Sequence, residues 1–325
     1  MPGIGQIHPA RHPRPASGPG RLVLLKLLLV ISAISYCAAA AERANIAILF
    51  PQVASTHARI YEEIMHGVSE HALTNTSTFA VTAETRPQDI SAWLNKTAAQ
   101  AILVLGQRSF RLVQELDTDM PMVVGAVVAP ADSYPTLSLS GDPDMFFSHL
   151  KSLAPRVKRV FIVYSEASSG WLVRLAEISA RKHGLELVAR PAETIREAVL
   201  HYRSVLETAH SDSDAIWLPM DRVAPDKTIL PMALDAAWKR RLVVFCSNPL
   251  YVKRGALFAL YPDHRKMGST LADMALEQIG NITLDGARPT RTLKLAVNQR
   301  TASHLGLHYP PDQERTFDLV YPGPR

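Results

Sequence analysis

The chain has very little cysteine: Cys37 and Cys246 are the only two in 325 residues. Cys37 lies in an N-terminal segment that we expect to be removed, and the bulky Tyr36 before it argues against lipid attachment. With Cys246 left alone, an intramolecular disulfide framework is excluded. Cys246 ends the apolar run 242–246, which predicts a small buried core residue rather than a reactive thiol.

The sequence also lacks the short motifs of nucleotide-binding and hydrolytic enzymes. No G-x-G-x-x-G or Walker A sequence opens an expected helix, and there is no G-x-S-x-G elbow or H-E-x-x-H pair. His304 and His308 are spaced i, i+4, but Gly306 weakens a helix there and no third ligand recurs. We therefore expect surface histidines, no metal, no cofactor and no catalysis. A secreted α/β enzyme is kept as an alternative function.

Acidic residues are missing from the first 41 residues. Three arginines precede an apolar run over 22–34 that only Lys26 interrupts, and alanines close it at 38–41. This order of positive, apolar and small residues is typical of a secretory signal peptide. The stretch 27–41 is shorter than the roughly 20 apolar residues of a membrane-spanning helix. We predict a cleaved signal peptide at 1–41, with a retained anchor as the alternative.

Removing this leader leaves almost no net charge. The leader holds four of the 35 Lys and Arg residues and none of the 30 Asp and Glu residues, so the net charge falls from +5 to about +1. No basic patch is then expected, which argues against nucleic acid as a partner. The cluster 239–241 is expected to be solvated at a helix C-terminus.

Short apolar, β-branched runs recur along the chain and end in Gly, Pro or polar loops. Such runs are typical of strands buried on both faces of a parallel sheet. They cover 45–50, 80–83, 101–105, 122–128, 160–164, 185–188, 215–218 and 242–246.

The segments between these runs carry apolar residues at helical spacing. Three such stripes are Ile60, Ile64, Val68 and Ala72; Leu172, Leu175, Ala176 and Ile178; and Met267, Leu271, Met274, Ala275 and Ile279. Strands that alternate with helices predict right-handed βαβ units. The sequence therefore predicts an α/β fold of two doubly wound parallel-sheet lobes, one before and one after about residue 145.

Ligands of open parallel sheets bind beyond the carboxyl ends of the strands. The loops at these ends are 51–57, 106–109, 129–134, 165–170, 219–225 and 247–251. Ser168 and Ser169 precede Gly170 between a strand and a helix, where they can hold an anion or cap the helix. Asp221 follows a strand and can accept a ligand ammonium, cap the next helix or pair with Arg222.

The second half of the chain resembles a known family. The segments that carry the resemblance are 157–164, 182–188, 214–221, 252–257, 261–263, 295–298 and 305–307, and 252–257 is the strongest match. In the first half the match is looser, over 101–106 and 120–124. Together they resemble a bacterial family of ABC-transporter substrate-binding proteins with the type I periplasmic-binding fold, and are similar to its amino-acid-binding members.

The resemblance implies a periplasmic clamshell, a monomer, that closes on a small solute and delivers it to a membrane permease. Lobe 1 would comprise 42–145 plus 260–288 and lobe 2 would comprise 146–259 plus 289–325, with hinge crossings near 145, 260 and 288. Carried over by position, the residues that would line the cleft are Gln107, Ser168, Ser169, Asp221 and Ser247.

Three loops depart from the family pattern, and all three are ligand loops. The loop 51–57 lacks the usual motif, 165–170 replaces an Asn-Pro-rich version, and Arg222 follows Asp221 in place of a small polar residue. The identity of the solute therefore stays open. A sensory receptor of the same fold, reporting to a membrane partner, is the alternative to transport.

Overall fold

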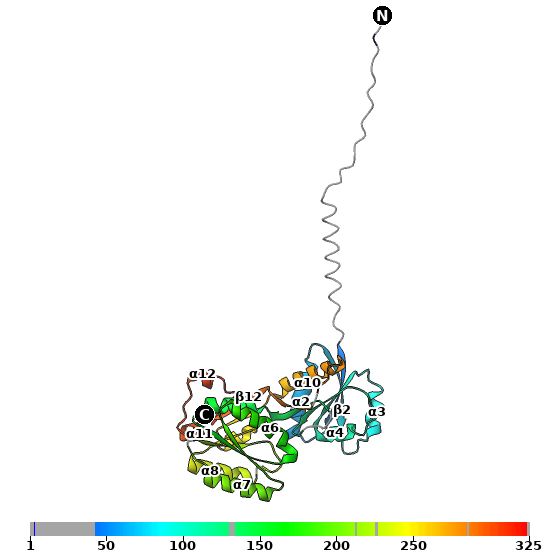
Figure 1. Cartoon of the computed structure of the whole chain (residues 1–325). Helices are drawn as coiled ribbons and strands as arrows, with labels where there is room; N and C mark the ends of the chain where they lie inside the picture. Colours follow the sequence, from blue (N-terminus) through cyan, green and yellow to red (C-terminus); the bar gives the residue numbers. More distant parts are fainter. Residues whose placement is uncertain are drawn as a thin grey trace. The chain divides into compact units, whose positions relative to one another are not determined.

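The computed structural model of the chain describes residues 3, 43–129, 134–211, 213–224, 227–284 and 286–323. Both sheets belong to one compact unit, Ala44–Arg325 (Figure 1). The predicted signal peptide and Cys37 lie outside the described residues. Within those residues, no helix has the length and apolar character needed to cross a membrane.

Sheet A is parallel and is built mostly from the first part of the chain. Its strands, as far as the structure describes the chain, are β1 (Ala44–Pro51), β2 (Thr74–Val81), β3 (Ala101–Leu105), β4 (Met122–Val127), β5 (Thr136–Gly141) and β11 (Ala287–Thr290). Their order is β11-β5-β4-β3-β1-β2, with parallel pairing throughout. From β1, the chain adds β2 on one side and then β3, β4 and β5 in turn on the other side. This is the doubly wound arrangement that was predicted.

Helices cover both faces of sheet A because its strands alternate their apolar side chains. Helices α2 (Ser55–Ser69) and α10 (His264–Ile279) pack on the face that carries Ile46 and Ile48. Helices α3 (Pro87–Leu94) and α4 (Gly106–Val113) pack on the face that carries Ala47 and Leu49. Although α10 follows a strand of the other sheet, it packs in the core of sheet A.

Sheet B is also mostly parallel. Its described strands are β6 (Arg159–Tyr164), β7 (Glu186–Pro191), β8 (Asp214–Leu218), β9 (Val243–Cys246), β10 (Phe258–Pro262), β12 (Leu293–Asn298) and β13 (Leu319–Tyr321). They lie in the order β13-β12-β10-β9-β8-β6-β7, and β12 runs antiparallel to β10. The described helices around them are α5 (Pro143–Leu153), α6 (Glu166–Lys182), α7 (Ile195–Thr208), α8 (Ile229–Arg240), α9 (Pro249–Arg254), α11 (Gln299–His304) and α12 (Pro311–Glu314).

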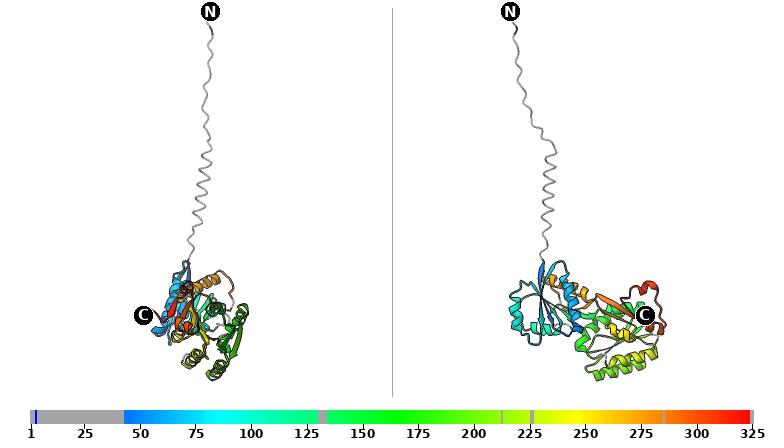
Figure 2. Two further views of the ribbon diagram at one scale, coloured as in Figure 1. Left: turned by 90° about the vertical axis from the view of Figure 1, so that its left-hand side faces the viewer. Right: turned by 180° about the vertical axis from the view of Figure 1, so that it is seen from behind.

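The two faces of sheet B carry separate apolar cores. On one face, α5 and α6 pack against Trp217 and Phe245, whose rings stack with centroids 6.0 Å apart at an interplanar angle of 11°. On the other face, α7 and α8 pack side by side (Figures 1 and 2). This second core contains Cys246, which is fully buried, and burial raises the pKa of its thiol to about 12. The predicted burial of Cys246 is confirmed.

The chain passes between the two sheets three times. The passages follow β5, β10 and β11, and they are joined by backbone hydrogen bonds. Asp142 N of the first passage donates to Thr290 O, and Asp263 N of the second donates to Thr292 O, each at 2.9 Å. The lobe boundaries predicted near 145, 260 and 288 fall close to these passages. That the two halves move as lobes about them stays a prediction.

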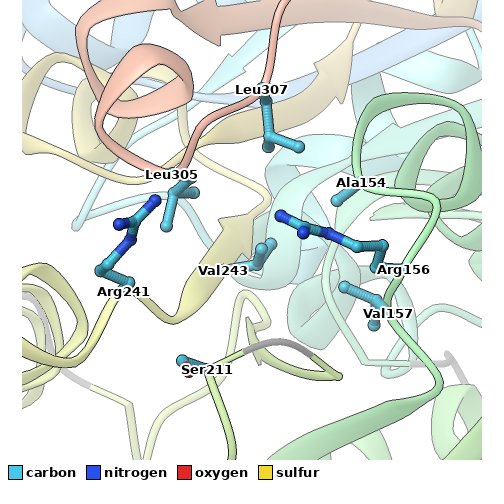
Figure 3. A pocket seen from close by; sticks show the side chains of 8 residues that line it. All are labelled: Ala154, Arg156, Val157, Ser211, Arg241, Val243, Leu305 and Leu307. Carbon is cyan, nitrogen blue, oxygen red and sulfur yellow. The ribbon is translucent and has the colours of Figure 1, made fainter.

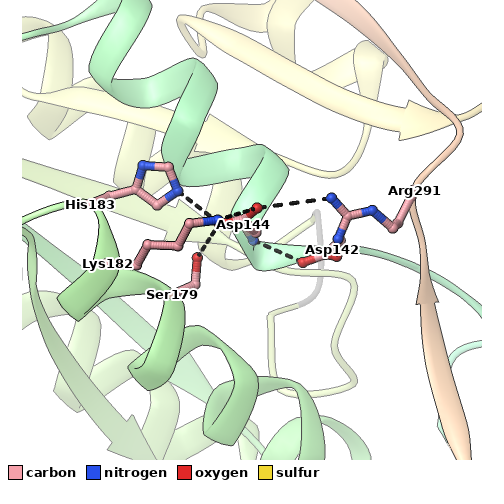
Figure 4. A network of polar contacts seen from close by, with 6 residues as sticks. All are labelled: Asp142, Asp144, Ser179, Lys182, His183 and Arg291. Carbon is pink, nitrogen blue, oxygen red and sulfur yellow. Dashed lines mark hydrogen bonds and ion pairs between the residues drawn. The ribbon is translucent and has the colours of Figure 1, made fainter.

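A network of charged side chains surrounds the first passage (Figure 4). Asp144, at the start of α5, accepts hydrogen bonds from Lys182 Nζ at 2.9 and 3.0 Å and contacts His183 Nε2 at 2.8 Å. Arg291 of the third passage pairs with Asp142 and lies 3.9 Å from Asp144. The hydrogen bonds from Lys182 and then His183 lower the pKa of the Asp144 carboxyl to about 2.

The lowered pKa of Asp144 predicts that this carboxyl makes the free energy of unfolding fall at acidic pH. Asp144→Asn should remove this contribution. A carboxyl whose pKa is lower in the folded state stabilises the protein fully above its unfolded pKa of about 4, and the contribution is lost as the pH falls toward about 2. We expect the free energy of unfolding to fall more steeply in the wild type than in Asp144→Asn between about pH 5 and pH 3. Urea unfolding at these pH values measures it, and parallel curves would contradict the prediction.

Some predicted strands are wrong in extent or burial. β2 occupies Thr74–Val81 instead of 80–83, and most of its side chains are at least partly in solvent. It lies at the edge of sheet A, where Thr and Asn are tolerated on exposed positions. β7 is likewise an exposed edge strand, so burial on both faces fails for these two strands. The sequence pattern also missed β5 and the strands from β10 onward.

Two of the predicted helical stripes need correction. The buried face of α6 is formed by Leu172, Val173, Ala176 and Ala180, whereas Leu175 and Ile178 are 38% and 60% exposed. A helix turns about 100° per residue, so apolar residues three apart can still lie outside the packed sector. The helix α2 ends at Ser69, before Ala72.

Candidate functional site

A cavity of about 370 Å³ lies at the carboxyl ends of β8, β9 and β10. Its walls come from both sheets and from the second passage between them: His57, Ile60, Leu139, Leu218, Pro219, Met220, Ser247, Asn248, Pro249, Tyr251, Tyr261, Pro262 and His264. Its volume is within the usual range of small-molecule sites. Its position follows the rule that open parallel sheets bind ligands at their carboxyl edge.

The walls of this cavity are mainly apolar, with a few neutral polar groups. Ile60, Leu139 and Met220 contribute aliphatic surface, and no Asp, Glu, Lys or Arg occurs among its described lining residues. Burial lowers the pKa of the His264 imidazole and so disfavours its charged form. Ser247 is 8% exposed and contributes a hydroxyl to the lining. Such walls suit a small organic solute with an apolar body.

Asp221 does not line the cavity, but it directly follows the lining residue Met220 in the chain. Its Oδ2 accepts hydrogen bonds from Ser165 N at 3.1 Å and from Ser169 Oγ at 2.5 Å, and its Oδ1 accepts one from Val223 N at 2.9 Å. These bonds fix the loop after β8 to the start of α6. A carboxylate offers about four acceptor positions, so one remains for another donor.

The structure decides between the local roles predicted for these loop residues. Arg222 donates from Nε to Ser165 Oγ at 2.8 Å and lies 3.4 Å from Glu193, so it pairs there and not with Asp221. Asp221 does cap the turn that follows it, through Val223 N. The predicted capping of α6 by Ser168 or Ser169 is wrong, because α6 begins at Glu166 directly after β6 and its N-cap is Ser165.

The sequence-predicted site residues are distributed unequally around the cavity. Ser247 lines it, and Ser169 and Asp221 are hydrogen-bonded to each other next to Met220. Ser168 is half-buried in the first turn of α6, and Gln107 is exposed at the second residue of α4. Of the five predicted residues only Ser247 belongs to the lining; Gln107, Ser168, Ser169 and Asp221 do not.

Several lining residues were not predicted from the sequence. His57, Met220 and Tyr251 fall within the segments 51–57, 219–225 and 247–251 that were predicted to follow strand ends, so their position carried a signal, although the structure places His57 in α2 and Tyr251 in α9. Tyr261 and His264 lie at the second passage, and Leu139 lies on the unpredicted β5. Among the residues the structure describes, no three His, Cys, Asp or Glu side chains are grouped to hold a metal ion.

The family model described as "ABC transporter substrate binding protein" matches residues 146–313, more than half of the chain. The chain belongs to this family. The predicted family is thereby confirmed, and with it the general role of a receptor that binds a solute for a membrane transporter. No curated protein matches the chain.

Solved structures similar to this family member support the fold. They include an ABC domain from Streptococcus pneumonia in complex with L-Trp (17% identity, TM-score 0.55, covering 86% of this chain and 100% of that one). The ligand-free, open substrate-binding protein CD0873 from Clostridium difficile has 17% identity and a TM-score of 0.60, covering 85% and 99%. A periplasmic ribose ABC transporter from Conexibacter woesei has 13% identity and a TM-score of 0.51, covering 86% and 99%. The predicted α/β fold of the type I periplasmic-binding class is confirmed.

Proposed function

We propose that this protein is a periplasmic receptor of an ABC-type importer that binds an amino acid between two lobes. The observation that carries the proposal is the cavity of about 370 Å³ whose walls come from both sheets. A ligand there contacts both halves at once, and it favours the arrangement in which both sets of contacts are made. The three passages would act as the hinge, with lobe 1 at 42–145 plus 260–288 and lobe 2 at 146–259 plus 289–325.

In this proposal different loops bind different groups of the ligand. Asp221 accepts a hydrogen bond from the ligand ammonium at its remaining acceptor position. Ser247 and Ser168, in the first turn of α6, hold the carboxylate, aided by the positive N-terminal end of that 17-residue helix. The aliphatic and tyrosine walls receive the side chain of the ligand. The L-Trp complex of the Streptococcus protein supports an aromatic amino acid as the first ligand to try.

A thermal-shift screen of the leader-free protein against the common amino acids and small carboxylates tests this function. A ligand that binds only the folded state adds about 2.7 kcal/mol at a concentration of 100 Kd, so the Tm should rise. Leu139→Trp, which fills the cavity from sheet A, should lose the shift. Leu200→Trp, at a leucine of α7 that is 58% exposed, should keep it. No shift with any compound, or an equal shift in Leu139→Trp, would refute the proposal.

Export to the periplasm carries its own prediction. The small residues at the end of the leader allow cleavage after Ala40 or Ala41, so the mature N-terminus should lie between Ala39 and Arg43. N-terminal sequencing of protein from the periplasmic fraction measures this directly. An intact apolar segment 22–34 in that material would show that the leader is retained as an anchor.

A further inference from the structure

Two further cavities lie at the opposite edge of sheet B, which we call the distal edge. The proposed solute site lies at the carboxyl ends of β8, β9 and β10, so the distal edge is where these parallel strands begin. Because β12 runs antiparallel to β10 and β13 follows β12, the carboxyl ends of these two strands also reach the distal edge. Here α11 begins at Gln299, directly after β12.

The larger of the two distal cavities, about 590 Å³, is lined by several basic side chains. Lys253 and Arg254 at the end of α9, and Arg300 in α11, line it together with Trp238. The Arg300 guanidinium lies 5.6 Å from the centroid of the Trp238 ring, which is 41% exposed. No Asp or Glu occurs among the described lining residues.

The smaller cavity, about 30 Å³, shows the same imbalance on the other side of α11 (Figure 3). Arg156 and Arg241 enter this cavity from opposite sides, with Val243 and Leu305 between them. No carboxylate lines this cavity within the described residues. The two cavities are close neighbours, because His304 stacks on Trp238 of the first with a centroid distance of 3.7 Å and the next residue, Leu305, lines the second.

Other basic residues near this edge have structural partners. Arg240 donates to the carbonyl oxygens of Leu206 and Ala209 and so ends α7. Arg159 pairs with the buried Asp214 at the start of β6 and β8, and Lys239 pairs with Asp235. By contrast, no acidic side chain lines either cavity in the described part of the chain. The basic residues that line them are Lys253, Arg254, Arg300, Arg156 and Arg241. Like charges held close together destabilise the fold unless an anion is bound between them.

We propose that the distal edge of sheet B binds phosphate groups, on both sides of α11. Guanidinium groups present paired N–H donors that match phosphate oxygens, and lysine adds a point charge. Two cationic cavities side by side favour a ligand with more than one phosphate, either a soluble polyphosphate or the headgroups of an anionic lipid. The expectation of no basic patch, drawn from the small net charge, is wrong because the fold gathers basic residues from four separate segments.

Pyrophosphate and lipid vesicles are the two probes that test this site. Pyrophosphate is titrated into the leader-free protein at low salt in a calorimeter. In a sedimentation assay, binding of the protein to phosphatidylglycerol vesicles is compared with binding to phosphatidylcholine vesicles. Lys253→Gln/Arg300→Gln removes two cations of the larger cavity. The matched control, Lys96→Gln/Arg111→Gln, removes two exposed cations from the part of the chain around sheet A.

We expect the wild type and the control to bind at least one probe, and Lys253→Gln/Arg300→Gln to bind it at least tenfold more weakly. Binding of pyrophosphate identifies a soluble ligand, and binding of phosphatidylglycerol vesicles alone identifies a lipid headgroup. Failure of both probes, or an equal loss in the control, overturns the proposal. If Lys253→Gln/Arg300→Gln does not fold, Arg156→Gln takes its place with the same expected loss. The solute-binding screen is independent of this result.

Discussion

Asp221→Asn is expected to lose most of the binding of the amino acid identified by the thermal-shift screen. The substitution keeps the size of the side chain but removes the charge that would accept the ligand ammonium. Breaking one partner of such a bond in a closed cleft costs about 2–5 kcal/mol, or roughly 30- to several-thousand-fold in affinity. Titration calorimetry on wild type and variant measures the ratio.

The same substitution should also destabilise the free protein. An amide has one acceptor oxygen, whereas Asp221 accepts from Ser165 N, Ser169 Oγ and Val223 N. At least one of these three donors then loses its partner, at a cost of about 1–3 kcal/mol. Asp235→Asn, which only breaks an exposed pair with Lys239, is the control and should change neither quantity. Wild-type affinity in Asp221→Asn would remove this carboxylate from the site.

Gly268→Ala should cause a large loss of stability through the packing of two helices. Gly268 of α10 and Gly67 of α2 let these helices cross at short distance. A Cβ on Gly268 would overlap the carbonyl oxygen of Ile64 and approach Gly67 Cα to 2.9 Å. Because the obstacle is backbone, the helices must separate, at a cost of about 3 kcal/mol. Alanine recovers only about 1 kcal/mol through its higher helix propensity, so packing decides the sign.

Gly280→Ala is the matched control for this prediction. Gly280 ends α10 with an ordinary negative φ of −75°, and a Cβ there would lie 3.5 Å from its nearest neighbours. Its free energy of unfolding should stay within about 0.5 kcal/mol of the wild type. Denaturant unfolding of both variants measures the difference. Gly268→Ala as stable as Gly280→Ala would show that the two helices do not cross as closely as described.

The sequence was sufficient to predict several of the strands that are buried on both faces. β1, β3, β8 and β9 are continuous apolar runs, and the order of their helices follows from the βαβ rule. β5 was missed because Ser138 and Ser140 interrupt its pattern. These serines are buried, and Ser138 Oγ donates to Val127 O and Val128 O, a tertiary contact that satisfies a polar side chain without a local sequence signal.

The candidate site could be predicted only in part. Asp221 and Ser247 could be predicted because each follows the carboxyl end of a predicted strand. The position of these ends in the sheet follows from the strand order. The contribution of Leu139, Tyr261 and His264 depends on how sheet A and the second passage face that edge. This arrangement is set by packing between distant segments, as when α10 returns to pack on α2, and no local periodicity encodes it.

Hydrogen–deuterium exchange with and without the amino acid that gives the largest thermal shift tests the central claim most directly. Binding between the sheets should slow exchange in segments on both sides of the cavity, around residues 57–60 in sheet A's helix α2 and around 218–223 and 247–251 in sheet B's loops. Leu139→Trp should abolish this protection. Protection confined to the loops of one sheet, or found only away from these residues, would contradict a solute held between the two halves.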